Sequence, residues 1–238
     1  MKAKKSLGQN FLKDRNVLNT IVEVAELSTE DYVVEIGPGK GILTKELVER
    51  AGKVTAIELD DRLIDELKKI EKLDLVHGDA LNWRPPEEEY KVVANIPYYI
   101  TSPLLNHFLQ AANRPSKMVL LVQKEVAEKI CAKDGKMNVL AIHVQVFGKP
   151  RIVCTVPPSA FTPQPKVDSA VIEIDVYDKA LVEDYRKMFG VVHRAFSNKR
   201  KMLSNTLPDY KEKLVELGFQ DLRPERLSIE DWKKLTQL

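Results

Sequence analysis

The stretch that decides the fold is DYVVEIGPGKGILTKELVER, residues 31–50. It opens with an apolar, β-branched run, which is typical of a buried strand in a parallel sheet. Gly37, Gly39 and Gly41 follow, and then a segment with apolar residues at helical spacing. Glycines at such a junction let a ligand approach the backbone at a helix N-terminus. The stretch predicts a strand, a ligand-binding turn and a helix, although a plain glycine turn also fits this motif taken alone.

The same alternation continues to about residue 175. Helical spacing recurs between further apolar runs, which predicts a parallel sheet covered by helices on both faces. We expect strands at 31–37, 53–59, 73–79, 90–96 and 117–123, and helices at 42–51, 61–70 and 102–112. Two more strands are expected at 151–156 and 169–176. The proline-rich loop between them is too short for a helical crossover, so it predicts an antiparallel pair at one edge.

The composition changes near residue 178. Helical patterns then dominate, at 180–196, 210–219 and 228–238, with a capped loop before the last. We therefore expect a sheet-containing domain at residues 1–177 and a small helical domain at 178–238.

The overall composition excludes some classes of protein. At 238 residues, with 44% hydrophobic and 30% charged residues, the chain has the balance of a soluble globular protein. Its apolar runs are shorter than the roughly 18 residues of a membrane span, and the lysine-containing N-terminus is not followed by the apolar run of a secretory signal. The two cysteines, Cys131 and Cys154, lack metal-ligand spacing, so we expect buried free thiols in a reducing cytosol and no metal.

Positive charge is concentrated in two places although the net charge is only +2. Each cluster taken alone is equally consistent with a solvated surface, but together they favour a polyanionic partner. One cluster is N-terminal, and the other lies in HRAFSNKRKML, which contains no acidic residue. Their members are Lys2, Lys4, Lys5, Lys13 and Arg15, and Arg194, Lys199, Arg200 and Lys201.

Two acidic residues follow successive predicted strands. Glu58 ends the second strand, 17 residues after Gly41, near the spacing at which an acidic residue binds the hydroxyls of a ribose. Asp79 ends the third strand, where a carboxylate can accept from an exocyclic amino group such as adenine N6. The turn reads G-x-G-x-G rather than G-x-G-x-x-G, so NAD fits less well. Either acid alone is an ordinary surface residue, but the pair beside a glycine turn predicts a site at the carboxyl edge of the sheet. This pattern resembles class I S-adenosylmethionine-dependent methyltransferases.

The fourth strand ends in NIPY, residues 95–98. This tetrapeptide resembles the N-x-P-Y motif of enzymes that methylate exocyclic amino groups. The lone pair of adenine N6 is delocalised into the ring, so the nitrogen is a poor nucleophile. The side-chain oxygen of Asn95 and the carbonyl of Ile96 can accept its two hydrogens, while Tyr98 stacks on the base. Prolines hold these acceptors in place.

Five motifs in order are similar to those of the KsgA-type ribosomal RNA adenine dimethyltransferases: KKSLGQNFLKD, NIPYYITSP, VQKEVAEKI, FTPQPKVDSAV and AFSNKRKML. The likeness covers essentially the whole chain. It implies a Rossmann-like, mostly parallel seven-stranded sheet with a C-terminal helical RNA-binding domain. It also implies S-adenosylmethionine as the methyl donor. The chain looks short for the family in its C-terminal part, and Ile96 stands where leucine is frequent, which we expect to be neutral.

The resemblance also implies roles for individual residues. Asn10 and Leu12 would cover the cofactor, Gly37 would contact its methionine part, and Glu58 its ribose. Asp79 would bind its adenine, and Asn95 both the cofactor and the target base. Tyr98 and Phe161 would close the two faces of the target adenine, although Phe161 taken alone is an ordinary loop aromatic. Arg194, Lys199, Arg200 and Lys201 would bind RNA, on a helix or on a helix broken near residues 197–198.

The implied reaction is dimethylation of N6 on two adjacent adenines, in a hairpin near the 3′ end of 16S RNA. The enzyme would act during ribosome biogenesis, as a cytoplasmic monomer without metal or membrane, on a small-subunit precursor particle. An Erm-type enzyme that modifies large-subunit 23S RNA is the nearest alternative. A non-catalytic RNA-binding or transcription factor on the same fold is a second, but the acids and the N-x-P-Y acceptors are all present. A DNA adenine methyltransferase is disfavoured by the basic helical tail.

Overall fold

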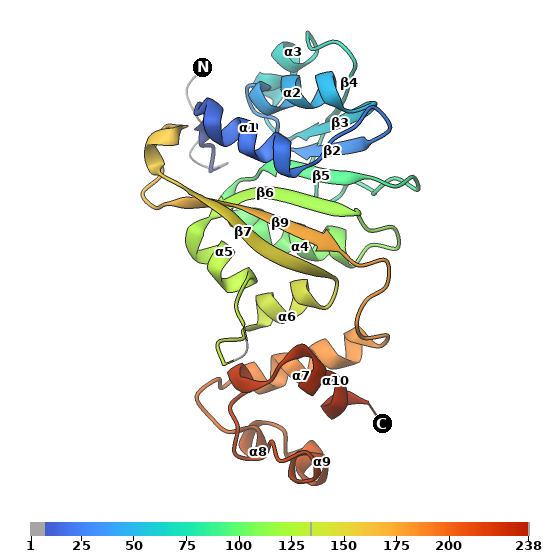
Figure 1. Ribbon diagram of the computed structural model, residues 1–238, viewed down its shortest axis with the longest axis vertical. Coiled ribbons are helices and arrows are strands. Elements are labelled where there is room, and N and C mark those ends of the chain that lie inside the picture. Colours follow the sequence, from blue (N-terminus) through green and yellow to red (C-terminus); the bar gives the residue numbers. More distant parts are fainter. Residues whose placement is uncertain (1–7, 134, 238) are drawn as a thin grey trace. The chain divides into compact units, whose positions relative to one another are not determined.

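The computed structural model describes residues 8–133 and 135–237. The chain forms two compact units. The first contains Met1–Ala127 and Pro150–Val176, and the second contains Glu128–Lys149 and Tyr177–Leu238. The second unit thus adds a segment from the middle of the chain to the C-terminal residues (Figure 1).

The first unit is built on a seven-stranded sheet with the order β4-β3-β2-β5-β6-β9-β7. Neighbouring strands from β4 to β6 are parallel, and β9 runs antiparallel to β6. The predicted mostly parallel sheet of seven strands is therefore confirmed, with the two late strands at one edge. The strands are β2 (Tyr32–Ile36), β3 (Lys53–Glu58), β4 (Leu73–His77), β5 (Lys91–Asn95), β6 (Lys117–Gln123), β7 (Gly148–Val156) and β9 (Ser169–Val176).

Helices lie on both faces of the sheet because its central strands are apolar on both sides (Figure 1). All five residues of β2 are buried. The helices α1 and α2 pack against one face, in a core that includes Val33, Val93 and Val119. Leu104, Leu105 and Phe108 of α4 are also fully buried. The helices of this unit are α1 (Arg15–Val24), α2 (Ile42–Arg50), α3 (Asp61–Leu67) and α4 (Thr101–Leu109).

Three features fix the ends of these elements near the carboxyl edge of the sheet. The carboxylate of Asp14 caps α1, and that of Asp60 caps α3. The strand β5 ends at Asn95 and passes through Pro97 into a short 3₁₀ helix, η2 (Tyr98–Ile100). A small second sheet pairs β1 (Phe11–Leu12) antiparallel with β8 (Phe161–Thr162), after the 3₁₀ turn η3 (Pro158–Ala160). The N-terminal segment is therefore joined to the proline-rich loop.

The second unit is helical. The predicted helices at 180–196, 210–219 and 228–238 correspond to the shorter α7, α9 and α10, and Ser228 and Asp231 form a capping box at the start of α10. Its core includes an aromatic cluster in which Phe147, Tyr185 and Phe189 contact one another. The elements are α6 (Val139–Gln145), α7 (Tyr185–Phe196), α8 (Leu203–Thr206), η4 (Pro208–Tyr210), α9 (Lys211–Glu216), η5 (Pro224–Arg226) and α10 (Ile229–Thr236). The helix α5 (Lys124–Ile130) crosses the division between the units.

Some expectations about single residues change with the structure. Cys131 and Cys154 are free thiols but are half-buried rather than buried. Burial still raises the pKa of Cys131 to about 11, which keeps it protonated at neutral pH. Within residues 8–133 and 135–237, no helix is long and apolar enough to cross a membrane, and no group of three or more His, Cys, Asp and Glu side chains is placed to hold a metal.

Candidate active site

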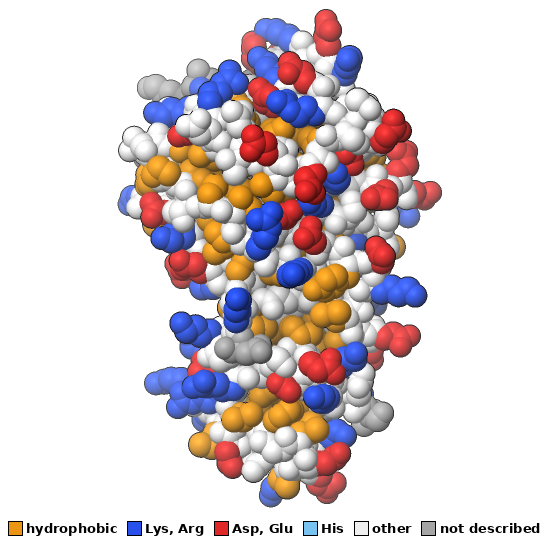
Figure 2. All heavy atoms as spheres, viewed as in Figure 1, with side chains coloured by type: hydrophobic (Ala, Val, Ile, Leu, Met, Phe, Trp, Pro, Cys, Tyr) orange, Lys and Arg blue, Asp and Glu red, His pale blue; other side chains and the backbone are white. Residues whose placement is uncertain are grey.

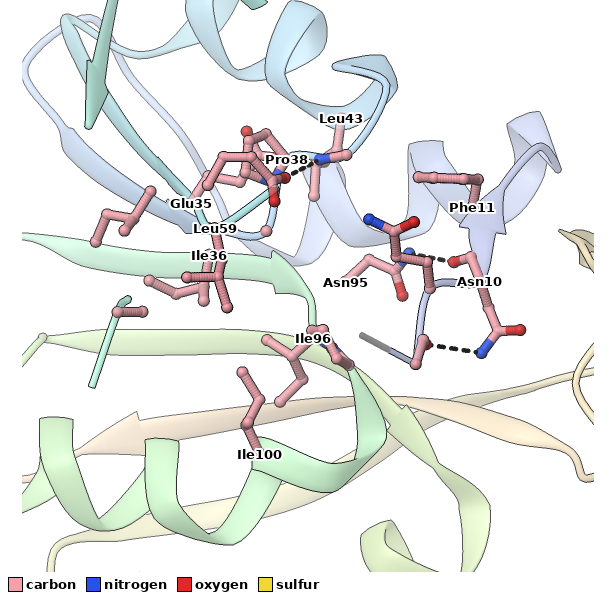
Figure 3. Close-up of a pocket in the computed structure, with 18 of the residues that line it drawn as sticks. Asn10, Phe11, Glu35, Ile36, Pro38, Leu43, Leu59, Asn95, Ile96 and Ile100 are labelled. Atoms are coloured by element: carbon pink, nitrogen blue, oxygen red, sulfur yellow. Dashed lines mark hydrogen bonds between the residues drawn. The ribbon is translucent and has the colours of Figure 1, made fainter. Parts of the chain in front are cut away.

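A pocket of about 210 Å³ opens at the carboxyl ends of the parallel strands, where α/β sheets bind ligands. Its walls come from five short segments of the first unit (Figure 3). They are the N-terminal residues 8–12, the segment 35–43 from the end of β2 through the glycine turn to the start of α2 (without Gly41), the end of β3 at 57–59, the loop after β4 at 78–81, and residues 95–100 after β5. The sequence therefore brings together Asn10, Leu12, Gly37, Glu58, Asp79, Asn95 and Tyr98.

The turn after β2 needs its glycines. Gly37, Gly39 and Gly41 have φ angles of +65°, +59° and +73°, which L side chains rarely adopt. A Cβ on Gly39 would lie 3.1 Å from the ring of Phe11, and one on Gly41 would lie 2.7 Å from Cδ1 of Ile70. The turn thus presents bare backbone to the pocket just before α2.

Glu58 is buried at the end of β3 and lines the pocket. One of its carboxylate oxygens accepts from the backbone N–H of Asp60 at 2.8 Å, and the other from the N–H of Gly39 at 3.1 Å. Burial raises the pKa of this carboxyl group, and the two backbone hydrogen bonds oppose that shift. The carboxylate is therefore fixed between the glycine turn and the start of α3.

Asp79 follows β4 on an exposed loop. Its Oδ1 accepts from the N–H of Leu81 at 2.9 Å, and the preceding Gly78 donates to the carbonyl of Glu58 at 2.9 Å. The register of β3 and β4 places Glu58 opposite His77. Both acids therefore lie at the same edge of the sheet, as parallel strands require.

Asn95 is the last residue of β5. Its Nδ2 donates to the backbone carbonyl of Asn10 at 3.1 Å, the bond drawn beside the two labels in Figure 3. This bond fixes the orientation of the amide, because the nitrogen must be the atom that meets a carbonyl. The side-chain oxygen of Asn95 is then an oriented acceptor at the pocket.

The turn after Asn95 holds two tyrosines in different environments. The hydroxyl of Tyr98 is 2.7 Å from Oγ of Ser169, and burial raises its pKa. Tyr99 is 57% exposed and contacts the N-terminal segment at Gly8, where an added Cβ would lie 3.3 Å from the ring. Tyr98 is thus a fixed wall residue, and Tyr99 is an exposed aromatic at the rim.

Phe161 does not line the pocket. It is fully buried and pairs with Leu12 in the small sheet, inside the same core cluster. Phe161 therefore does not lie at the pocket opposite Tyr98, where the resemblance placed it. The physical reason is that Phe161 pairs with Leu12 in the small sheet and its side chain packs in the core cluster.

Glu35 and Phe11 are among the pocket residues that sequence reasoning missed. Glu35 is buried in β2, and its Oε2 has no hydrogen-bond partner among the described residues. Burial raises its pKa to about 8, so it holds its proton at neutral pH. The signal for it was an acidic residue inside an apolar strand. Phe11 packs against Gly39 and lies under Nζ of Lys40, 5.0 Å from the ring centroid, and no local pattern showed this contact.

The basic segment of the second unit is a loop rather than a continuous helix. The helix α7 ends at Phe196, and Lys199, Arg200 and Lys201 lie in the turn before α8. These three residues are exposed, and their side chains form no ion pair with any other residue that the structure describes. Figure 2 shows Lys and Arg side chains gathered at the position of this loop.

Arg194 differs from the other three cations of this cluster. The motif itself contains no acidic residue, but Arg194 pairs at 2.7 Å with Asp209, which lies outside the motif. In the N-terminal cluster, Lys2, Lys4 and Lys5 lie outside the described residues, whereas Lys13 and Arg15 are exposed.

The strand order, the glycine turn after β2 and the pocket at the carboxyl edge define an α/β methyltransferase fold. The family can be stated more closely. The chain belongs to the ribosomal RNA adenine dimethylase family, whose profile matches residues 1–236.

Individual relatives agree with this family. Ribosomal RNA small subunit methyltransferase A from Dehalococcoides mccartyi is 43% identical, over 99% of this chain and 88% of that protein. A dimethyladenosine transferase from Plasmodium falciparum has a similar structure, with a TM-score of 0.86, 30% identity, and coverage of 94% of this chain and 95% of that chain. The 23S rRNA methyltransferase ErmE is similar with a TM-score of 0.79, 29% identity, and coverage of 95% and 98%.

Proposed function

We propose that this protein transfers methyl groups from S-adenosylmethionine to N6 of adenines in small-subunit ribosomal RNA. The products would be N6,N6-dimethyladenosines at two adjacent positions in a hairpin near the 3′ end of 16S RNA, made on a precursor particle by a cytoplasmic monomer. The observation that carries this proposal is the amide of Asn95, held with its oxygen free to accept at the pocket.

The pocket residues fit the cofactor. The glycine turn leaves room for a ligand against the backbone, since only Pro97 Cδ, at 3.7 Å, is near an added Cβ on Gly37. The two oxygens of Glu58 are held by backbone donors, which fixes them for the paired hydroxyls of a ribose. Asp79 would accept from the adenine amino group, Gly37 would contact the methionine part, and Asn10 and Leu12 would cover the ligand. When bound, the cofactor supplies a methyl group already activated on a sulfonium.

The protein's part in the reaction is to make the amine nucleophilic and to hold it in line. The side-chain oxygen of Asn95 and the carbonyl of Ile96 would accept the two N6 hydrogens, which favours a pyramidal nitrogen with a localised lone pair. Ile96 is buried, so its backbone is held in place. Tyr98 would stack on the base that enters the pocket. Held by these two acceptors, the nitrogen would present its lone pair to the methyl group that the cofactor supplies, and its released proton would pass to solvent water.

Two surfaces would hold the RNA. Tyr99, exposed at the rim, offers a stacking face to a nucleotide beside the target. Lys199, Arg200 and Lys201 offer charge that no carboxylate of the described residues neutralises, which suits phosphates. Arg194 would contribute less, since Asp209 already pairs with it.

The second candidate is methylation of large-subunit RNA, because ErmE shares the fold over nearly the whole chain. The higher identity to proteins named small subunit methyltransferase A favours the first. The test is incubation of unmodified small-subunit and large-subunit particles with the protein and labelled S-adenosylmethionine, followed by primer extension. Stops at two adjacent adenines of the small-subunit RNA are expected. Label in the large-subunit RNA alone would instead support the second candidate.

A further inference from the structure

Residues 8–12, called the strap below, all line the pocket. The strap is held along its length by separate contacts, and Figure 3 shows the one between Asn10 and Asn95. The carbonyl of Asn10 accepts from Asn95, the ring of Phe11 lies against Gly39, and Leu12 pairs with Phe161. A bound ligand in the pocket therefore has the strap as one of its walls.

Gln9 gives the strap one further contact, with Asp60 after the end of β3. Its Nε2 donates to Oδ2 of Asp60 at 2.7 Å. The side chain of Asp60 is fully buried and is held by the guanidinium of Arg62, with Nε at 2.8 Å and Nη2 at 2.5 Å. This acceptor is therefore rigid and charged, because the Arg62 guanidinium keeps the pKa of Asp60 well below its usual range.

Asp60 is also bonded to the residue proposed to bind the ribose. Its backbone N–H donates to Oε1 of Glu58 at 2.8 Å, and that N–H is buried. Two hydrogen bonds thus connect the strap to Glu58, one through the side chain of Asp60 and one through its backbone. Any displacement of Asp60 moves both the anchor of the strap and a donor to Glu58.

We propose that Gln9 and Asp60 form a latch that keeps the strap closed over the cofactor and sets how fast the cofactor leaves. Gln9 is a positioning residue in this role, acting through Asp60 rather than on the reacting atoms. The proposal rests on the proposed cofactor site. The closed strap is a pre-formed wall of the cofactor pocket. If the strap opens, a smaller fraction of the protein is competent to bind the cofactor, and the apparent affinity for the cofactor falls by the same factor.

The test is a charge series at Gln9, read by the binding and release of S-adenosylhomocysteine. Gln9→Ala removes the bond and should speed release by about 10-fold, in line with a hydrogen bond to a charged acceptor. Gln9→Glu places a second carboxylate against Asp60 and should speed release further. Gln9→Lys offers a cation and should release the ligand no faster than the wild type. This ordering follows the charge of Asp60 and would not arise from a packing role alone.

Two further variants sharpen the test. Asp60→Asn keeps the cap of α3 and removes the charge. In this background Gln9→Glu should raise the logarithm of the ligand release rate by less than half of the increase that it causes in the wild type. Gln110→Glu makes the same exchange outside the pocket lining and should release the ligand at the wild-type rate.

The latch is refuted if the three Gln9 variants release the ligand at the wild-type rate, or if Gln9→Glu and Gln9→Lys speed release equally. Melting temperatures near that of the wild type would show that the strap variants remain folded. If Asp60→Asn fails to fold, the series at Gln9 alone still decides. A wild-type protein that does not bind S-adenosylhomocysteine would refute the proposed function itself, which separates that failure from failure of the latch.

Discussion

The pocket of the first unit and the basic loop of the second hold their polar groups in opposite ways. In the pocket, Glu58 and Asn95 are each fixed by hydrogen bonds to backbone atoms. In the loop, Lys199, Arg200 and Lys201 are exposed and have no ion-pair partner among the described residues. Chemistry on a weak nucleophile needs acceptors that are already oriented, whereas attraction of phosphates needs only charge near the surface. The comparison predicts that damage to the pocket lowers rate or cofactor affinity, and damage to the loop lowers RNA affinity.

The largest effect is expected at Asn95. Asn95→Ala removes the oriented acceptor and should lower the rate of methyl transfer by about 10²-fold or more, without loss of the fold. Single-turnover transfer to small-subunit particles measures it. The same exchange at the exposed Asn19 on α1 is the matched control and should keep the wild-type rate. Turnover of Asn95→Ala near the wild-type rate would contradict the mechanism.

The next effect is expected at Glu58. Glu58→Ala would remove the charge-assisted hydrogen bonds that we propose Glu58 makes to the ribose, on the order of 1.5–3 kcal/mol each, so affinity for S-adenosylmethionine should fall by at least about 10-fold. Titration calorimetry measures this affinity. Glu49→Ala, on the exposed face of α2, serves as the control. Unchanged affinity in Glu58→Ala would remove this residue from the site.

Changes in the basic loop, residues 199–201, should differ in effect from the Asn95 and Glu58 variants. Replacing Lys199, Arg200 and Lys201 with alanine should weaken RNA binding and reduce its salt slope by about 0.7–0.9 for each phosphate that the loop no longer binds. Affinity for S-adenosylmethionine should not change. The triple alanine variant of Lys68, Lys69 and Lys72 removes equal charge from the first unit and controls for net charge. Wild-type RNA affinity at every salt concentration would show that the loop is only a solvated surface.

The last prediction concerns stability and pH rather than catalysis or binding. Burial holds the pKa of Glu35 at about 8, against 4.5 for an ordinary glutamate. Between these values the folded state keeps a proton that the unfolded chain has lost, so the stability from this group falls as pH rises. Glu35→Gln stays neutral and should gain stability relative to the wild type, by up to about 1.4 kcal/mol per pH unit across this window. Urea unfolding at pH 5 and pH 8 measures the difference, and an equal difference at both would contradict it.

The sequence predicted the sheet well because the strands are long apolar runs separated by helical patterns. Parallel strands end at one edge of a sheet, so the sequence alone placed Glu58, Asp79 and Asn95 together. The helix α6 (Val139–Gln145) was missed, since a short and mostly apolar segment has no clear period. The two-residue strands β1 and β8 are too short to leave a pattern.

The contacts that complete the site were beyond sequence reasoning because they join distant parts of the chain. Gln9 meets Asp60 and Asn10 meets Asn95, across separations of 51 and 85 residues. Phe161 illustrates the converse. A motif suggested a role for its ring at the pocket, but pairing with β1 turns it into the core. Local patterns place residues on elements, whereas tertiary contacts decide which way a loop side chain faces.

The comparison between the pocket and the basic loop is tested most directly by one kinetic measurement. The single-turnover rate of methyl transfer is followed against the concentration of small-subunit particles, for Asn95→Ala and for the Lys199, Arg200 and Lys201 triple alanine variant. The triple variant should reach the wild-type maximal rate at a higher particle concentration, and Asn95→Ala should lose the maximal rate with its half-saturating concentration nearly unchanged. A triple variant that loses the maximal rate, or an Asn95→Ala that recovers it at high RNA concentration, would contradict this division of roles.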